Sequence, residues 1–107
     1  MRYNVIRGME IRFATKDLEA LYTTEQGAAR YPVAVVEAFF DLVTLIAEAP
    51  DERDLRALKG VHFEKLPSKD VFSMRLNKQW RLELVFEPPK GSDKTAVIIR
   101  ISNNYGD

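Results

Sequence analysis

The stretch FSMRLNKQWRLELVFE, residues 72–87, decides the fold. Apolar and polar residues alternate on both sides of a polar break at 77–79, which predicts two half-buried strands joined by a hairpin turn. One face carries the apolar side chains Phe72, Met74 and Leu76 from the first strand and Trp80, Leu82, Leu84 and Phe86 from the second. Arg75 and Arg81 then lie near the turn on the opposite face. They are either ordinary solvent-facing charges or part of a site that binds an anion.

The N-terminal half predicts a strand followed by two helices. Residues 9–14 alternate as a strand does, and Thr15 is a suitable N-cap for a short helix that ends near Gly27. A second helix begins at Pro32 and ends before Pro50. Its apolar residues within 33–46 cover most of its circumference, so we expect it to be buried mainly in the core, with part of this surface available to a partner.

The C-terminal half predicts the remaining strands. A charged connector, DERDLRALKG (51–60), leads to a short strand at 61–66. A loop follows the hairpin at 87–94, and the last strand covers 96–104, with Val97, Ile99 and Ile101 directed inward. The expected fold is a two-layer α+β domain over residues 1–107, in which the N-terminal strand and the helical hairpin pack on an antiparallel sheet of four to five strands. Residues 1–8 either extend the first strand or form an arm.

Composition limits the functional classes. The chain has no cysteine and a single histidine, so neither a disulfide framework nor a clustered metal site is expected. No signal peptide or membrane span is recognisable, which fits a cytoplasmic protein without a cofactor. The total charge is neutral, but the charges are unevenly distributed along the chain. Residues 1–54 hold six basic and ten acidic residues, a net charge of minus four. Residues 55–107 hold ten basic and six acidic residues, a net charge of plus four. The basic half suits a polyanionic partner.

The stretch from Leu55 to Glu87 resembles the toxins of the RelE/ParE superfamily, and most closely HigB-like toxins of bacterial toxin-antitoxin pairs. In such sequences a linker with leucine and lysine leads to a strand and then to a hairpin of the form S-x-R-x-N-x-Q-[WY]-R. Here that motif is formed by Ser73, Arg75, Asn77, Gln79, Trp80 and Arg81. The helical hairpin and the final strand fit the same layout from Met9 onward.

The resemblance implies an endoribonuclease that cuts mRNA on the ribosome and is neutralised by a helix-turn-helix, HigA-like antitoxin. Arg81 stands where the superfamily places an arginine that contacts phosphate, and Arg75 lies across the turn from it. Arginine suits this role because its planar guanidinium binds two phosphate oxygens and keeps its charge near neutral pH. The basic residues expected to hold the RNA backbone or ribosomal RNA are Lys59, Lys65, Lys69 and Lys78.

The chain departs from the family at its C-terminus. HigB-like toxins commonly end the last strand with a tail that contains histidine, and Asn104 stands where that histidine is expected. An amide does not exchange protons near neutral pH. Natural divergence, an inactivating substitution and a chemistry that uses other groups are the three explanations. The remaining acid/base candidates are Tyr105 and His62, and His62 is equally well interpreted as a partly buried strand residue.

Two further functions remain open at this stage. One is a catalytically impaired homologue that still binds an antitoxin and regulates its operon, which Asn104 and the neutral total charge favour. The other is a ParE-like inhibitor of DNA gyrase, which shares the fold and requires no acid/base pair. Arg75 and Arg81 also have a structural interpretation, as charges paired with Glu64 or Glu83 across the strands.

Overall fold

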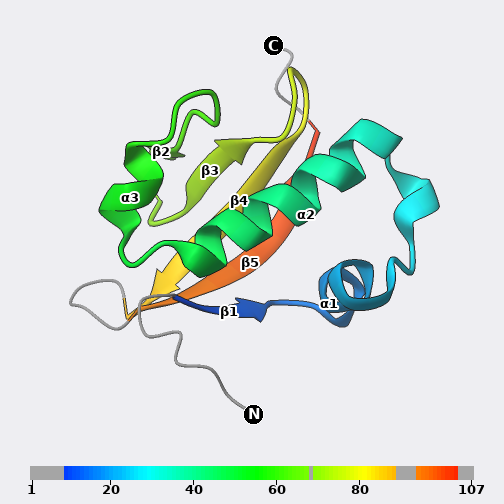
Figure 1. Cartoon of the computed structure of the whole chain (residues 1–107), viewed down its shortest axis with the longest axis horizontal. Coiled ribbons are helices and arrows are strands. Elements are labelled where there is room, and N and C mark those ends of the chain that lie inside the picture. Colours follow the sequence, from blue (N-terminus) through cyan, green and yellow to red (C-terminus); the bar gives the residue numbers. More distant parts are fainter. Residues whose placement is uncertain (1–8, 68, 89–93, 104–107) are drawn as a thin grey trace.

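The computed structural model describes residues 9–67, 69–88 and 94–103 (Figure 1). Asn104 and Tyr105 lie outside these residues, as do residues 1–8. The elements, in chain order, are β1 (Glu10–Phe13), α1 (Lys16–Thr24), a 3-10 helix η1 (Ala28–Arg30), α2 (Val33–Glu48), α3 (Glu52–Arg56), β2 (Glu64–Lys65), β3 (Phe72–Arg75), β4 (Arg81–Glu87) and β5 (Thr95–Ser102).

The five strands form one mixed sheet in the order β1-β5-β4-β3-β2. Strands β2 to β5 are antiparallel, which confirms the predicted hairpin and the strand that follows it. Strand β1 adds to the edge of β5 in parallel, with Phe13 opposite Ile98. A parallel neighbour is expected here because a long connection containing the helices separates β1 from the rest of the sheet.

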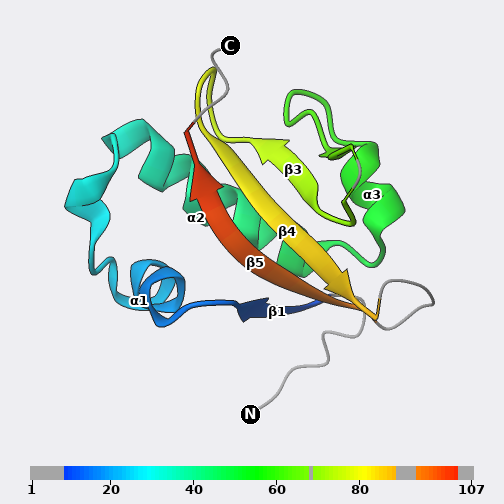
Figure 2. The same cartoon turned by 180° about the vertical axis from the view of Figure 1, so that it is seen from behind.

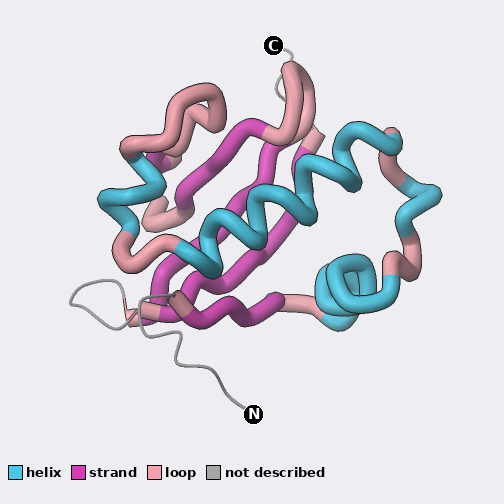
Figure 3. The backbone as a smooth tube through the Cα atoms, in the orientation of Figure 1, coloured by secondary structure: helices cyan, strands magenta, loops and turns pink. Residues whose placement is uncertain are grey.

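Helices cover one face of the sheet and leave the other uncovered. Figures 1 and 3 show α2 lying across β4 and β5, while Figure 2 shows these strands and β3 from behind with no helix in front of them. The predicted α+β architecture of two layers is therefore confirmed. Polar side chains at the centre of the sheet can lie only on the uncovered face without entering the core.

The core forms between α2 and the covered face of the sheet. From α2, Phe39, Val43 and Ile46 are fully buried, and they meet Leu82 and Leu84 of β4, which are also fully buried. Trp80 packs against this cluster and its ring meets that of Tyr31 edge-to-face at 5.6 Å between centroids. The interpretation of Trp80 as a core residue is confirmed. Burial of this kind stabilises a fold by about 1.5–3 kcal/mol for each large apolar side chain.

The helix boundaries follow local signals in the sequence. The Thr15 hydroxyl accepts a hydrogen bond from the Leu18 N–H and thereby caps α1. Pro32 is the residue immediately before α2, and the helix ends two residues before Pro50. The segment predicted as a plain connector contains one further helix, α3, which Asp51 caps by accepting from the Arg53 N–H. Leu55 of α3 is fully buried and fixes this helix to the core.

Two strand predictions need correction. The predicted strand 61–66 is reduced to Glu64 and Lys65, because His62 has a φ of 49° and cannot continue an extended chain. In β5 the predicted facing was wrong for Val97 and Ile99, although Val97 is buried at 3% exposure. Val97 pairs with Val85 on the uncovered face.

The cause of the β5 error is an irregularity in the ladder. Glu83 pairs with Arg100 and its neighbour Leu84 pairs with Ile98, so Ile99 is an extra residue between the two pairs. Such a bulge reverses the alternation on one side of it. Ala96 and Ile98 therefore belong to the core, while the prediction for Ile101 was correct because Ile101 lies beyond the bulge opposite Leu82.

The outer side of α2 keeps some apolar surface exposed. Val33 is 74% exposed and Leu45 is 38% exposed. A pocket of about 350 Å³ lies beside Val33, with Ala28, Val36 and Phe40 among its lining residues and two carboxylates, Glu25 and Glu37, completing the lining. Most of the wide apolar face of α2 lies in the core, as expected. The pocket beside Val33 is the part of this face that remains accessible.

Candidate functional site

Two neighbouring rungs of polar residues cross the uncovered face of the sheet. In the first rung Glu64, Ser73, Glu83 and Arg100 stand opposite one another on β2, β3, β4 and β5. In the second rung Arg75, Arg81 and Ser102 do so on β3, β4 and β5. Directly opposed residues in antiparallel strands direct their side chains to the same face. The ladder thus brings three arginines and two glutamates onto one surface.

Arg81 lies at the centre of this surface and its guanidinium is held from three directions. Nε donates to the Ser73 hydroxyl at 2.6 Å, and Nη2 donates to the His62 carbonyl at 3.1 Å. Nη2 also lies 3.5 Å from the Glu64 carboxylate. The Arg81 side chain is only 11% exposed. These contacts fix its orientation, as an arginine that binds an anion in a defined geometry requires.

Arg75 is placed directly opposite Arg81 and is held differently. Its backbone N–H donates to the Val61 carbonyl at 2.6 Å, which joins β3 to the segment before β2. Its Nε is enclosed and has no hydrogen-bond partner within the described residues. A buried guanidinium donor without a partner is costly.

Glu83 and Ser73 occupy the middle of the first rung and are buried despite the absence of a covering helix. Ser73 is fully buried and Glu83 is 6% exposed. The Glu83 carboxylate pairs with Arg100 at 3.3 Å. Neither Glu83 nor Ser73 is predicted as a site residue from the sequence. In a strand, residues two positions apart share a face, so Glu83 lies on the same face as Arg81, and Ser73 on the same face as Arg75. This alternation is the sequence signal that could have identified them.

His62 contributes its backbone to the site. The residue is exposed and adopts a left-handed conformation, and its carbonyl accepts the Arg81 bond already described. Val61 and His62 therefore bring the segment before β2 against both arginines. The interpretation of His62 as a partly buried strand residue was wrong, because His62 is exposed and lies outside β2.

Comparison with known proteins identifies the family. The family described as RelE-like toxin of type II toxin-antitoxin system HigB matches residues 11–91, which is most of the chain. The chain belongs to the HigB-like family of RelE-like toxins. No curated protein matches it. Among solved structures it is similar to the YoeB/ParE toxin from Agrobacterium tumefaciens, with a TM-score of 0.58 and 17% identity, over 91% of this chain and 100% of that one. At that identity the match shows the fold only.

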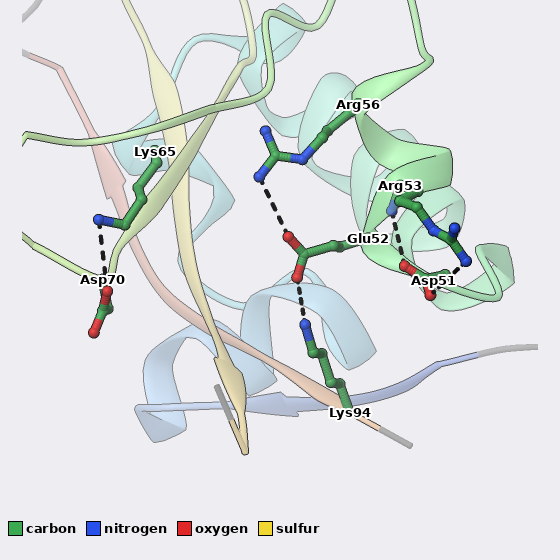
Figure 4. Close-up of polar contacts among 7 residues, drawn as sticks. All are labelled: Asp51, Glu52, Arg53, Arg56, Lys65, Asp70 and Lys94. Atoms are coloured by element: carbon green, nitrogen blue, oxygen red, sulfur yellow. Dashed lines mark hydrogen bonds and ion pairs between the residues drawn. The ribbon is translucent and has the colours of Figure 1, made fainter. Parts of the chain in front are cut away.

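The four lysines of this HigB-like chain do not share one surface. Lys65 pairs with Phe72 in the ladder, so it lies on the helical side of the sheet, where it contacts Asp70 at 3.6 Å (Figure 4). Lys78 is exposed in the turn that joins the two arginine-bearing strands. Lys59 and Lys69 are exposed in the segments that precede and follow β2. Of the four, Lys78 is nearest in the chain to the arginine rung.

A partly buried ionic cluster fixes α3 to the start of β5. Glu52 is bound by Lys94 on one side and by Arg56, at 3.3 Å, on the other (Figure 4). The side chains of Glu52 and Lys94 are 17% and 15% exposed. Arg56 also lies over the stacked rings of Phe63 and Phe72. The cluster holds both ends of the segment 57–63 that delivers the Val61 and His62 carbonyls to the site.

At the N-cap of α3 the pKa of one carboxyl, that of Asp51, is shifted. The Arg53 backbone N–H donates to Asp51 and lowers the pKa of that carboxyl below its ordinary value of 3.8. Within the described residues no three His, Asp or Glu side chains gather as metal ligands would. No helix in the same part of the chain is long and apolar enough to cross a membrane.

Proposed function

We propose that this chain is a ribosome-dependent mRNA endoribonuclease that acts in the cytoplasm and is neutralised by a helix-turn-helix antitoxin. The observation that carries the proposal is the placement of Arg75 directly opposite Arg81 on the uncovered face of the sheet. Its membership of a toxin family of type II systems supports it, because such a toxin is paired with an antitoxin. No helix covers this arginine-bearing face, so an RNA strand that the ribosome presents can approach it from that side.

The reaction we propose is internal transfer at an RNA phosphate. The ribose 2′-oxygen attacks its own 3′ phosphorus, the bond to the 5′-oxygen of the next nucleotide breaks, and a 2′,3′-cyclic phosphate and a 5′-hydroxyl result. One proton leaves the 2′-hydroxyl and one reaches the 5′-oxygen. The non-bridging oxygens of the phosphate carry extra negative charge in the transition state. Arg75 and Arg81 stabilise that charge from adjoining strands, and a fixed donor of this kind contributes roughly 100-fold to the rate.

The proton carriers remain proposals based on position. His62 is the only imidazole of the chain, and its backbone is bonded to Arg81. Asn104 and Tyr105 lie outside the described residues, and the strand that leads to them reaches Ser102, opposite Arg81. We propose that His62 or Tyr105 exchanges the protons and that Asn104 orients the RNA through its amide. The lysines Lys59, Lys65, Lys69 and Lys78 contribute to binding of the RNA backbone and ribosomal RNA.

For the antitoxin we propose contact with the outer side of α2. The pocket beside Val33 offers an apolar floor, and Glu25 and Glu37 add negative charge. Helix α2 itself carries three acidic residues and no basic one, so this side complements a segment with apolar and basic residues. The antitoxin would then occupy the layer opposite the arginine face.

The proposed activity is tested by induced expression in a bacterial host, with sequencing of transcript ends. The wild-type chain should arrest growth and cut translated mRNA. Arg75→Gln should abolish both, because the buried Nε and its charge are lost. Arg75 is preferred to Arg81 for this test, because the Arg81 guanidinium donates to Ser73 and His62, and the loss of those bonds would also destabilise the fold. Arg12→Gln, an exposed arginine on β1, is the matched control and should remain toxic.

A second candidate function is a catalytically impaired toxin that binds its antitoxin and regulates the operon. Asn104, in the position where related toxins carry histidine, favours it. Asn104→His separates the two functions. If the wild-type chain is harmless and Asn104→His cuts mRNA, the scaffold lacked only a proton carrier and the second function is the better one. Intact mRNA together with DNA damage signalling would instead indicate a gyrase inhibitor.

A further inference from the structure

Arg81 is surrounded by acceptors of two kinds. The Ser73 hydroxyl and the His62 carbonyl are neutral, short-range acceptors at 2.6 and 3.1 Å, and both belong to segments fixed by the ladder or by backbone bonds. Glu64 is charged, and its carboxylate lies at 3.5 Å, the limit of a hydrogen bond. The Glu64 side chain is 60% exposed, whereas that of Arg81 is 11% exposed. The anion therefore stands on the solvent side of the cation.

We propose that Glu64 is an internal substitute for the RNA phosphate, which it resembles as an oxyanion on Nη2 of Arg81. The inference rests on the proposed function and adds a regulatory step to it: a phosphate that binds Nη2 of Arg81 from the solvent side competes with the Glu64 carboxylate. Ser73 and His62 keep the guanidinium in place during the exchange, since neither of their contacts needs to break.

The exchange has a physical reason. A buried guanidinium that loses its counterion is strongly destabilising, so a site that is empty between substrates needs a resident anion. Glu64 supplies such an anion on the solvent side of Arg81 when no RNA is present. Its exposure lets the side chain rotate into water, where a carboxylate is well solvated, when a phosphate arrives.

The exchange also disfavours RNA that offers few other contacts. A phosphate on Arg81 replaces an existing ion pair, so its net gain is small unless other contacts hold the strand. RNA that is not bound to the ribosome has only its contact with Arg81 to offset the displacement of Glu64. An mRNA held by the ribosome is already positioned, so its other contacts offset that displacement. Glu64 therefore limits binding to RNA in the cell other than the presented mRNA.

The test measures binding of a fluorescent single-stranded RNA with 2′-O-methyl riboses, which cannot be cleaved, by anisotropy at several salt concentrations. Glu64→Gln keeps the size of the side chain and removes its charge. We expect Glu64→Gln to tighten binding about three- to fivefold, the upper part of the range of one ion pair near a surface. The slope of log affinity against log salt should steepen by about 0.7, the value for one more phosphate neutralised on a single strand.

Glu87→Gln is the matched control. It makes the same chemical change and releases another arginine, Arg12, from its ion pair, but at the exposed edge formed by β1 and the end of β4. Binding by Glu87→Gln should stay within about twofold of wild type. Equal tightening by both variants would show an effect of net charge alone and would overturn the inference.

Weaker binding by Glu64→Gln would also overturn the inference, because Glu64 would then help to bind RNA. Absence of binding by both wild type and Glu64→Gln would overturn it too. The result is separate from the cleavage assay: tightening by Glu64→Gln with no cleavage by the wild-type chain would refute the proposed nuclease and leave the exchange at Arg81 standing. If the wild-type chain cleaves mRNA and Glu64→Gln binds RNA no more tightly than wild type, the exchange at Arg81 is refuted and the proposed nuclease stands.

Discussion

Replacing Ser73 by alanine should weaken both the fold and the proposed activity. Ser73 is fully buried, and its hydroxyl accepts the shortest bond that Arg81 makes, at 2.6 Å from Nε. A hydrogen bond to a charged group contributes about 1.5–3 kcal/mol, and the loss applies here because Arg81 is largely shielded from water that might replace the hydroxyl. We expect Ser73→Ala to lower the free energy of unfolding by about 2 kcal/mol.

That loss is measurable by thermal and chemical denaturation. In a domain near this size, about 2 kcal/mol lowers the melting temperature by about 10 °C. Ser102→Ala is the matched control, because Ser102 is a half-buried serine on the neighbouring strand opposite Arg81 and its removal leaves the Nε bond intact. The control should shift the free energy of unfolding by no more than about 0.5 kcal/mol.

Activity provides the second measurement on the same variant. At a temperature where Ser73→Ala remains folded, its cleavage of translated mRNA should fall by about tenfold or more, because the guanidinium is no longer fixed. Equal stability of the Ser73 and Ser102 variants would refute the reasoning about Arg81. If Ser73→Ala loses the expected stability, about 2 kcal/mol, and its cleavage of mRNA is unchanged, the orientation of Arg81 is irrelevant to the reaction.

Three further predictions concern the rest of the molecule. Glu52→Gln should lower the free energy of unfolding by about 2 kcal/mol in urea denaturation, because Lys94 loses a partly buried ion pair; an unchanged midpoint would contradict this. The pKa of Asp51 is lowered by the Arg53 N–H, so its stabilising contribution is present above a pH of about 4 and is lost as the pH falls through the lowered value. Asp51→Asn should therefore reduce the fall in melting temperature between about pH 6 and pH 3, and an identical pH profile would rule this out. Leu82→Ala should cost about 2–5 kcal/mol, since Leu82 is fully buried beneath α2, and a smaller loss in guanidinium denaturation would argue against that packing.

Local patterns in the sequence were sufficient for the main elements. The hairpin was predicted because apolar residues alternate on both sides of Asn77, whose side-chain oxygen accepts the Gln79 and Trp80 N–H groups and closes the turn. The cap at Thr15 and the proline before α2 gave the helix starts. Each of these signals depends on residues a few positions apart, which a sequence displays directly.

The errors arose where distant parts of the chain decide the local structure. Nothing in the residues near Ile99 shows that one of them is extra, since the bulge depends on how β5 pairs with β4. Helix α3 has only five residues, too few for a periodic pattern, although Asp51 was an available N-cap signal. Strand register also decides the position of Lys65, because its ladder partner Phe72 puts it on the face opposite the arginines.

The pairing of Arg81 with Glu64 was anticipated from the sequence as a cross-strand charge pair, whereas the other contacts of Arg81 were not. Arg75 and Arg81 were selected from the motif, and the ladder places them opposite each other. The environment of Arg81 combines Ser73 of β3, Glu64 of a two-residue strand and the carbonyl of His62. The sequence of β4 alone does not predict these neighbours, because they come from three separate segments of the chain.

The central claim is that Arg75 and Arg81 together hold one RNA phosphate while the chain is bound to a translating ribosome. A cryo-EM structure of that complex, with a 2′-deoxy nucleotide at the cleavage position to prevent the reaction, tests it most directly. The account predicts a phosphate within hydrogen-bond distance of both guanidinium groups, with the Glu64 carboxylate turned away from Arg81. It is contradicted if the mRNA phosphates contact neither arginine, or if the RNA lies on the helical side of the sheet.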